Sequence, residues 1–335
     1  MIILTDCLTE IVDEGALKVA NSLTKRIKKE YPDTTIITYG HRKSKITDIH
    51  LNLNKFFLNL SLIKRIKNEE CLYIPFSSNT SASIIRTFIL SYFTKLKVMF
   101  VLKHPMNTLS KKLLKLANPK IYVLSKDSYD YFESFGLKDI VYIQTGVDVQ
   151  QFTPVTKEKK NELREKYQID KNETIILHVG HLHGGRNVDK LLLLNEVSKP
   201  YLVVSSVSKQ DEALRKQLEE SNVKIIDTYI SNIEEIYQLS DVYFFPVTES
   251  ENCIDVPLSV LEAAACNLPI LTTNYGELKS FIKEDGFVFI DSFEKSKLIK
   301  SFNETLSKNI IKNRETVLSY DWSLAIKQLT GNPNL

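Results

Sequence analysis

The stretch from Val242 to Leu278 constrains the fold of this chain more than any other part of the sequence. It begins with the apolar, aromatic run VYFFPV, which is typical of a buried strand in a parallel sheet. After the acidic loop TESENCID, the run PLSVLEAAAC has apolar residues at helical spacing. Because proline is favoured in the first helical turn, we expect this helix to begin near Val256 to Ser259. NLPILTT is predicted to be the next strand, so the stretch indicates an open α/β sheet.

A helix that starts directly after a strand and a loop offers an anion site. The N–H groups around Leu258 and Ser259 have no partner within the helix and are expected to face the loop, where the helix dipole favours a phosphate. Glu262 lies one turn further on, where it would accept hydrogen bonds from sugar or ribose hydroxyls. Most glutamates on helices are merely solvated, and the spacing alone does not decide between these interpretations.

Length and composition favour a globular protein of two domains. The chain has 335 residues, of which 43% are hydrophobic and 25% charged. The four cysteines show no C-x-x-C pair or disulfide-like spacing and read as buried thiols in a reducing compartment. No apolar run follows a basic start, and charged or polar residues interrupt every apolar stretch. We therefore expect a cytoplasmic protein, or one peripheral to the cytoplasmic face of a membrane.

Charge is distributed unevenly along the chain. Residues 1–155 hold 22 Lys+Arg against 14 Asp+Glu, whereas the remainder holds 22 against 27. A basic half suits nucleic acid, anionic lipid or a phosphorylated acceptor, but a lysine-rich composition with solvated faces is equally compatible. The segment NTLSKKLLKLANPK is predicted to be an amphipathic helix, either on an anionic membrane surface or simply covering the sheet. No nucleic-acid-binding module is recognisable, so we expect no nucleic-acid partner.

Strands and helices alternate along both halves of the chain, as in doubly wound parallel sheets. MIILTD is a predicted strand that leads through Gly15 into a helix, and KVMFVLKHP is a buried strand followed by His104. Residues 55–67 are predicted to be a helix. In the second half, ETIILHVGHLHGGRNVDKLLLL is predicted to be a strand, a loop rich in Gly and His, and a helix, which is again an anion-site layout.

Two other classes of site fit the sequence less well. The G-x-G-x-x-G pattern is absent, which argues against a nicotinamide dehydrogenase. His178, His181 and His183 suggest a metal, but no carboxylate or cysteine lies at ligand spacing. We therefore expect no metal site there.

The segment PLSVLEAAACNLPILTT resembles the donor site of retaining GT-B glycosyltransferases of the broad group 1, or family 4, type. The family pattern there is roughly E-G-F-G-L-P-x-x-E-A-M-A. Glu262 matches the second glutamate, which in the family contacts the ribose of the nucleotide. The first glutamate falls on Ile254, and we expect the adjacent Asp255 to replace it.

Two further segments carry the same resemblance, which covers residues from about 120 to 330 and extends more loosely before that. GVDVQQFTP resembles the family segment at which the chain leaves the N-terminal domain. In the family pattern V-G-R-L…K, Gly180 matches, His181 replaces the Arg, and Arg186 replaces the Lys that grips the donor diphosphate. The family also implies a phosphate-binding role for the loop at Gly15 and a sugar or acceptor contact for His104, although a lone histidine after a strand is often structural.

The resemblance implies two Rossmann-like domains that face each other across a cleft. We expect an acceptor-binding domain at 1–158, a nucleotide-sugar-binding domain at 159–315, and a final segment, 316–335, that packs back on the first domain. The implied activity is metal-independent transfer of a hexose, with retention, from a UDP- or GDP-sugar to a glycan or lipid-linked acceptor. Arg186, Asp255 and His104 would act in catalysis, and no cofactor is expected. A non-catalytic partner subunit of a transferase, or a nucleotide-sugar 2-epimerase on the same fold, is the alternative.

Overall fold

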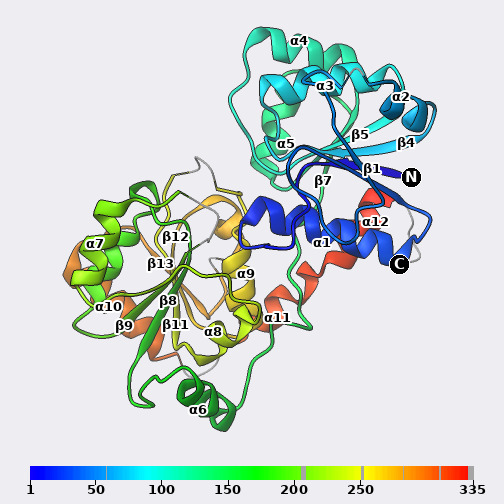
Figure 1. Ribbon diagram of the computed structural model, residues 1–335. Coiled ribbons are helices and arrows are strands. Elements are labelled where there is room, and N and C mark those ends of the chain that lie inside the picture. The colour runs from blue at the N-terminus through cyan, green and yellow to red at the C-terminus, as the bar shows by residue number, and fades with distance from the viewer. Residues whose placement is uncertain (58, 205–208, 250–252, 282, 309–310, 331–335) are drawn as a thin grey trace. The chain divides into compact units, whose positions relative to one another are not determined.

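The computed structural model describes residues 1–57, 59–204, 209–249, 253–281, 283–308 and 311–330. The chain forms two compact units. The first comprises 1–145, 254–256 and 322–335, and the second comprises 146–253 and 257–321. Both units are α/β, as the alternation of strands and helices predicts, and each is described by itself (Figure 1). The sequence boundary expected at 158/159 lies inside the second unit, which begins at Gly146.

A parallel sheet in the order β3-β2-β1-β4-β5-β6-β7 forms the centre of the first unit. Alternate residues of its strands point to opposite faces and both faces are buried, which explains why these strands read as continuous apolar runs. The strands are β1 Ile2–Thr5, β2 Thr35–Tyr39, β3 Ile49–Leu51, β4 Glu70–Ile74, β5 Lys95–Phe100, β6 Lys120–Val123 and β7 Ile140–Tyr142.

Helices cover both faces of this sheet. On one face, a single hydrophobic core cluster contains residues of the sheet and of α2, α3, α4 and α5. On the other face, α12 packs against α1. The carbonyl of Leu329 in α12 accepts a hydrogen bond from Lys97 Nζ at 3.0 Å. Trp322, the first residue of α12, is buried. The helices are α1 Gly15–Glu30, α2 Leu60–Ile66, α3 Ser81–Ser91, α4 Thr108–Ala117, α5 Lys126–Glu133 and α12 Trp322–Thr330.

The second unit repeats this plan with a parallel sheet in the order β10-β9-β8-β11-β12-β13. Its strands are β8 Ile175–Gly180, β9 Lys199–Val204, β10 Lys224–Ile226, β11 Val242–Phe245, β12 Ile270–Thr273 and β13 Phe287–Ile290. Its helices are α6 Lys157–Lys166, α7 Glu212–Glu220, α8 Ile233–Leu239, α9 Leu258–Ala265, α10 Lys295–Leu306 and α11 Asn313–Val317, with 3-10 helices η1 Gly184–Arg186, η2 Val188–Leu194, η3 Gly276–Phe281 and η4 Leu318–Tyr320.

Two predicted helices differ from the structure. The helix expected at 55–67 begins only at Leu60, because Phe57 has a positive φ of 60° and the Asn59 side chain caps the N–H groups of Ser61 and Leu62. The segment after β8 forms the 3-10 helices η1 and η2 instead of an α-helix. They are separated by Asn187, whose φ of 53° cannot continue a right-handed helix. The helix expected near 256–259 does begin at Leu258, after Pro257.

The cysteines are free thiols, and Cys7, Cys71 and Cys266 are buried, as their spacing predicts. Within the described ranges no helix has both the length and the apolar character needed to cross a bilayer.

Candidate active site

The second unit gathers predicted donor-site residues at the carboxyl ends of its central strands. β8 and β11 are neighbours in the sheet, and the chain leaves them toward opposite sides. In open α/β sheets this switch point is where ligands bind. Gly180 ends β8, and the helix that begins at Leu258 follows β11 in the chain.

Tyr243, in β11, links the end of β8 to the start of α9. Its hydroxyl donates to the carbonyl of Val179 at 3.4 Å and also hydrogen-bonds the Ser259 side chain. Burial raises the pKa of this hydroxyl, which therefore stays protonated. Tyr243 thus connects Ser259, in the first turn of α9, to Val179, the residue before Gly180.

His178 explains why position 180 is a glycine. The imidazole is fully buried, and its Nδ1 lies 2.8 Å from the Phe244 carbonyl oxygen. Because a carbonyl only accepts, Nδ1 carries the proton. A Cβ on residue 180 would lie 2.8 Å from Nε2 of the same ring. Burial lowers the pKa of His178 to about 4, so the ring is neutral at neutral pH.

Arg186 is the buried cation of this loop. It ends η1 and is only 7% exposed. The next residue, Asn187, donates through Nδ2 to the Pro246 carbonyl and to Thr248 Oγ1, both at 3.0 Å. These two bonds fasten the Arg186 loop to the segment that follows β11. Sequence reasoning missed Asn187, although its place between two glycines and a hydrophobic run is typical of a residue with positive φ.

His183 adds little positive charge to the loop. Burial, followed by the charge of Arg186, lowers the pKa of His183, whose Nδ1 accepts from the Gly185 N–H at 3.2 Å. The His181 ring lies 6.5 Å from the His183 ring and is partly exposed. At neutral pH the cation of the loop is therefore Arg186 rather than His178 or His183.

The side chain of Glu262 is buried rather than solvated. It is 5% exposed, and its Oε2 accepts from the Tyr237 hydroxyl at 2.8 Å. Burial raises the pKa of Tyr237 well above its ordinary value, so the hydroxyl remains a donor. A buried carboxylate needs such a donor because desolvation without a partner is costly. Tyr237 lies in α8, and nothing in the local sequence pattern identifies it as this partner.

Ile254 and Asp255 belong to the first unit by their contacts. Oδ2 of Asp255 accepts from the hydroxyls of Ser125 and Ser128, at 3.2 Å for Ser128. Ser125 also caps α5 through the Ser128 N–H at 3.0 Å. Asp255 thus lies at the N-terminus of α5, which is the positive end of the helix dipole.

The apolar neighbour of Asp255 is packed against the loop glycine of the first unit. Gly15 begins α1, and a Cβ on it would lie 3.2 Å from Cδ1 of Ile254. Ile254 is 6% exposed. Ile254, on which the first glutamate of the family pattern falls in the sequence, is thus a buried aliphatic side chain next to Gly15.

His104 follows β5 and is held by its backbone. Its N–H donates to Asn79 Oδ1 and its carbonyl accepts from Asn79 Nδ2, both at 2.8 Å. The Tyr131 hydroxyl donates to the same carbonyl at 3.0 Å. The imidazole is partly exposed, and burial lowers its pKa. His104 thus has a fixed backbone and a ring that can act as a neutral acceptor or donor.

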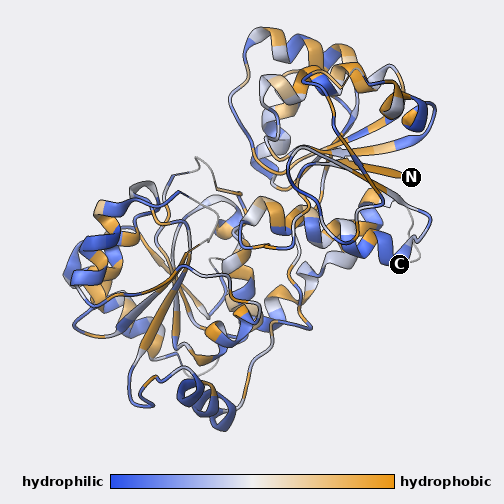
Figure 2. Cartoon of the chain, in the orientation of Figure 1, coloured by the Kyte–Doolittle hydropathy of each residue, from blue (hydrophilic) through white to orange (hydrophobic). Residues whose placement is uncertain are grey.

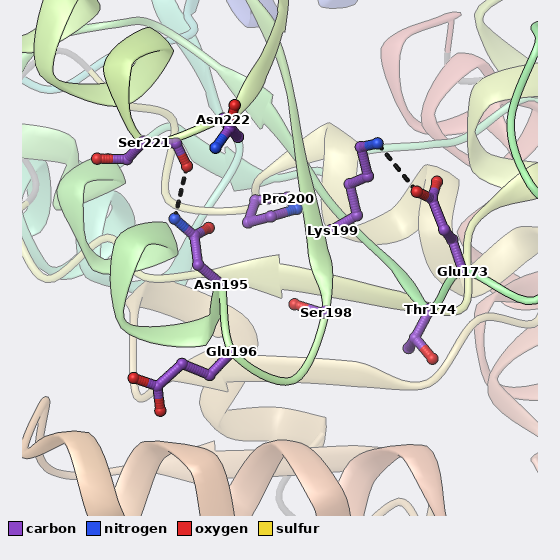
Figure 3. A pocket seen from close by; sticks show the side chains of 9 residues that line it. All are labelled: Glu173, Thr174, Asn195, Glu196, Ser198, Lys199, Pro200, Ser221 and Asn222. Atoms are coloured by element: carbon purple, nitrogen blue, oxygen red, sulfur yellow. Dashed lines mark hydrogen bonds and ion pairs between the residues drawn. The ribbon is translucent and has the colours of Figure 1, made fainter.

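Two cavities lie at opposite edges of the second sheet. A cavity of about 210 Å³ at the carboxyl ends of β12 and β13 is next to the Asn187–Thr248 contact and is lined by Thr248, Thr273, Asn274, Ile290, Asp291, Ser292 and Phe293. A larger hollow of about 470 Å³ lies at the amino ends of β8 and β9, where Lys199 pairs with Glu173 and Asn195 bonds Ser221 (Figure 3). Ligands of such sheets bind at carboxyl ends, and the smaller cavity lies at that edge, although none of the predicted donor-site residues lines it. In the chain as described, no group of three or more His, Cys, Asp or Glu side chains is arranged to hold a metal ion.

Comparisons with known proteins agree with this geometry. Residues 159–319 match the family "Glycosyl transferases group 1". The resemblance found in the sequence is thereby confirmed for the greater part of the second unit. No curated protein sequence matches the chain.

Solved structures show the fold of the whole chain. A glycosyltransferase from Rickettsia africae ESF-5 is 16% identical, with a TM-score of 0.74, over 98% of this chain and 96% of that one. HepE of Anabaena in complex with UDP-glucose is 14% identical, with a TM-score of 0.72, over 98% of both chains. Sucrose-phosphate synthase from Thermosynechococcus elongatus is 14% identical, with a TM-score of 0.72, over 98% of both chains. The chain has the GT-B fold of two Rossmann-like domains, and residues 159–319 of its second unit are similar in sequence to group 1 glycosyltransferases.

Proposed function

We propose that this protein transfers a hexose from a nucleotide-diphosphate sugar to a glycan or lipid-linked acceptor, with retention and without a metal. The observation that carries the proposal is that Arg186 is buried on a loop that is hydrogen-bonded, through Asn187, to the segment after β11. This loop lies at the same edge of the sheet as the start of α9. The similar protein HepE binds UDP-glucose, which supports a nucleotide-sugar donor.

The chemistry follows from where charge develops. As the glycosidic bond to the diphosphate breaks, negative charge grows on the leaving phosphate and positive charge on the sugar. Arg186 and the N–H groups at Leu258 and Ser259 would stabilise the phosphate charge, and His181 would add a donor. A phosphate oxygen would take the proton of the acceptor hydroxyl on the face that the leaving group vacates, which retains the anomeric configuration.

The remaining predicted residues would orient the substrates. Glu262, held by Tyr237, would accept from the ribose hydroxyls. Asp255 would orient the sugar hydroxyls through Oδ1, because the two serine hydroxyls bond to Oδ2. His104 would contact the sugar or the acceptor, and the loop at Gly15 would approach the donor.

Thermal stabilisation by a panel of UDP-, GDP-, ADP- and CMP-sugars tests the donor site. Stabilisation by one nucleotide class that is lost in Arg186→Ala would assign the donor and the phosphate site together, and its size follows ligand concentration over affinity. No stabilisation by any member would refute the donor-site proposal.

Product analysis tests the finer claims. NMR of the product anomer distinguishes retention from inversion, and unchanged turnover in a metal chelator is expected for a metal-independent enzyme. Inversion, or loss of turnover that a divalent cation restores, would contradict these parts.

A non-catalytic partner subunit is the second candidate, because Ile254 fills the position of the family's first glutamate. Donor hydrolysis by the purified chain separates the two functions. A partner subunit binds the donor without turnover, whereas the transferase hydrolyses it slowly in the absence of acceptor.

A further inference from the structure

Three helices of the first unit form a basic surface with exposed apolar side chains. α2, α3 and α4 cover the same face of the sheet, because their buried residues Leu62, Ile84 and Leu114 belong to one core cluster (Figure 1). The opposite sides of these helices therefore face outward together. We call this outer side the α2–α4 surface.

The charge of this part of the chain is strongly one-sided. Residues 51–126 hold 13 Lys+Arg and only two Asp+Glu, Glu69 and Glu70. None of α2, α3 and α4 contains an acidic residue. The excess of 22 Lys+Arg over 14 Asp+Glu in residues 1–155 is thus concentrated around these helices. A surface that is merely solvated would carry charges of both signs.

The same helices expose the largest apolar side chains. Among the described residues, the four most exposed large hydrophobic side chains are Leu60 (76%), Leu116 (73%), Tyr92 (71%) and Leu109 (62%). They lie on α2, on α4 and at the end of α3. Leu109 and Leu116 are two turns apart on α4, with the exposed Lys112 between them. Hydrophobic and hydrophilic residues alternate on α3 and α4, whereas α6 of the second unit is largely hydrophilic (Figure 2).

Polar contacts hold the surface as one rigid platform. Ser81 at the start of α3 accepts hydrogen bonds from Ser110 Oγ at 3.2 Å and Asn107 Nδ2 at 3.3 Å, which join α3 to α4. Arg86 of α3 donates to the Lys55 carbonyl at 3.1 Å and lies 4.9 Å from the Phe57 ring centroid, which joins α3 to the segment before α2. The leucines are therefore presented without a folding step, and their insertion costs little conformational entropy.

We propose that the α2–α4 surface docks the protein on an anionic phospholipid bilayer. Lysines attract the phosphate-bearing headgroups, and leucines with a tyrosine enter the boundary between headgroups and acyl chains. Nucleic acid would satisfy the lysines but not the exposed leucines. This docking does not depend on the donor chemistry, so it stands or falls separately from the proposed transferase activity.

Vesicle flotation tests the docking. We expect the protein to float with phosphatidylcholine vesicles that contain phosphatidylglycerol, to float far less with phosphatidylcholine alone, and to be released by high salt. Lys111→Gln with Lys112→Gln and Lys115→Gln should weaken partitioning by about five-fold per lysine, on the order of a hundred-fold in total. Leu109→Ser with Leu116→Ser should weaken it by roughly ten-fold or more.

Matched variants on the second unit provide the controls. Lys157→Gln with Lys159→Gln and Lys224→Gln removes three exposed lysines, and Leu306→Ser with Leu318→Ser removes two exposed leucines. Both should float like the wild type, and all variants should keep the wild-type melting temperature and stabilisation by nucleotide sugar. The proposal would be overturned if the control variants lost as much vesicle binding as the α2–α4 variants, or if the wild type did not float with anionic vesicles at low salt. Lysine-dependent binding of a labelled RNA without vesicle binding would also overturn it.

Discussion

The first loops of the two units occupy corresponding places and contain opposite chemistry. β1 and β8 are each the central strand at which the strand order reverses, and each leads into a loop at the carboxyl edge. The loop after β1 contains Asp6, Glu10, Asp13 and Glu14, and the loop after β8 contains Arg186 and no acidic residue before it. Similar topology therefore does not give the two loops the same charge.

Contacts within the loops reinforce this difference. In the first unit, Asp6 Oδ1 accepts from the Phe76 N–H at 2.8 Å, and Gly15 is covered by Ile254. In the second unit, Gly184 has open space around its Cα. The first loop is thus acidic and packed at Gly15, whereas the second contains a buried arginine and has open space at Gly184. The comparison teaches that two loops at corresponding places in similar sheets can differ in charge and packing, so residue chemistry has to be considered together with topology.

Replacing the cation of the second loop should have the largest effect. Arg186→Ala is expected to lower transfer by roughly 10²- to 10³-fold, because a preorganised donor to the developing phosphate charge is lost. Arg186→Lys should retain part of the activity, since the charge remains but the bidentate geometry does not. Asp6→Asn in the first loop keeps the bond to Phe76 and should leave donor stabilisation unchanged. Equal losses in Arg186→Ala and Asp6→Asn, measured as initial rates and thermal shifts, would abolish the contrast between the loops.

Acid should destabilise the second unit through His178. Its pKa is about 4 in the folded state and about 6.5 when unfolded, so the unfolded chain binds the extra proton first. The stability that neutral His178 contributes is complete above pH 6.5 and is lost as pH falls toward 4, by about 3 kcal/mol in total.

Urea unfolding of wild type and His178→Asn across this pH range measures the effect. The asparagine amide places an N–H donor near the position of Nδ1 for the Phe244 carbonyl but does not titrate in this range. We expect a flatter pH dependence in the variant, and parallel curves would show that His178 is not the group responsible.

Alanine substitutions of Gly180 and Gly184 should differ in their effect on stability, because only Gly180 is crowded by a neighbouring side chain. Gly180→Ala places a methyl group 2.8 Å from His178 Nε2 in a buried site, and overpacking of this kind costs about 1–3 kcal/mol. Gly184→Ala meets no atom within 4 Å and should change stability by less than about 0.5 kcal/mol. Urea midpoints compare the two variants, and equal midpoints would contradict the packing argument.

The smallest effect is expected at Glu262. Glu262→Gln keeps an oxygen that accepts from Tyr237 but removes the charge, which should cost about 1 kcal/mol of stability and weaken nucleotide binding modestly. Tyr237→Phe and the double variant complete a cycle that isolates the bond. Unaltered nucleotide affinity in Glu262→Gln would contradict its predicted role at the ribose.

Much of the fold and part of the site could be predicted from the sequence. The alternation of apolar runs with amphipathic segments indicated two doubly wound units, and Pro257 marked the start of α9. Arg186, Gly180 and Ser259 were predicted as donor-site residues from the resemblance and from the strand, loop and helix order, and the structure has this element order at one sheet edge. The helix predicted after β8 is present as the 3-10 helix η2, and the apolar pattern revealed neither its helix type nor the positive φ of Asn187 before it.

Tertiary structure alone decided the partners of the site residues. Asp255 bonds Ser125 across 130 positions of sequence, Glu262 bonds Tyr237, and Ile254 covers Gly15. Periodicity and propensity are local properties, and they determined which segments form strands and helices and which residue types lie in each loop. Contacts between residues distant in sequence depend on how helices and strands pack against one another, and the local patterns of a single sequence do not specify that packing.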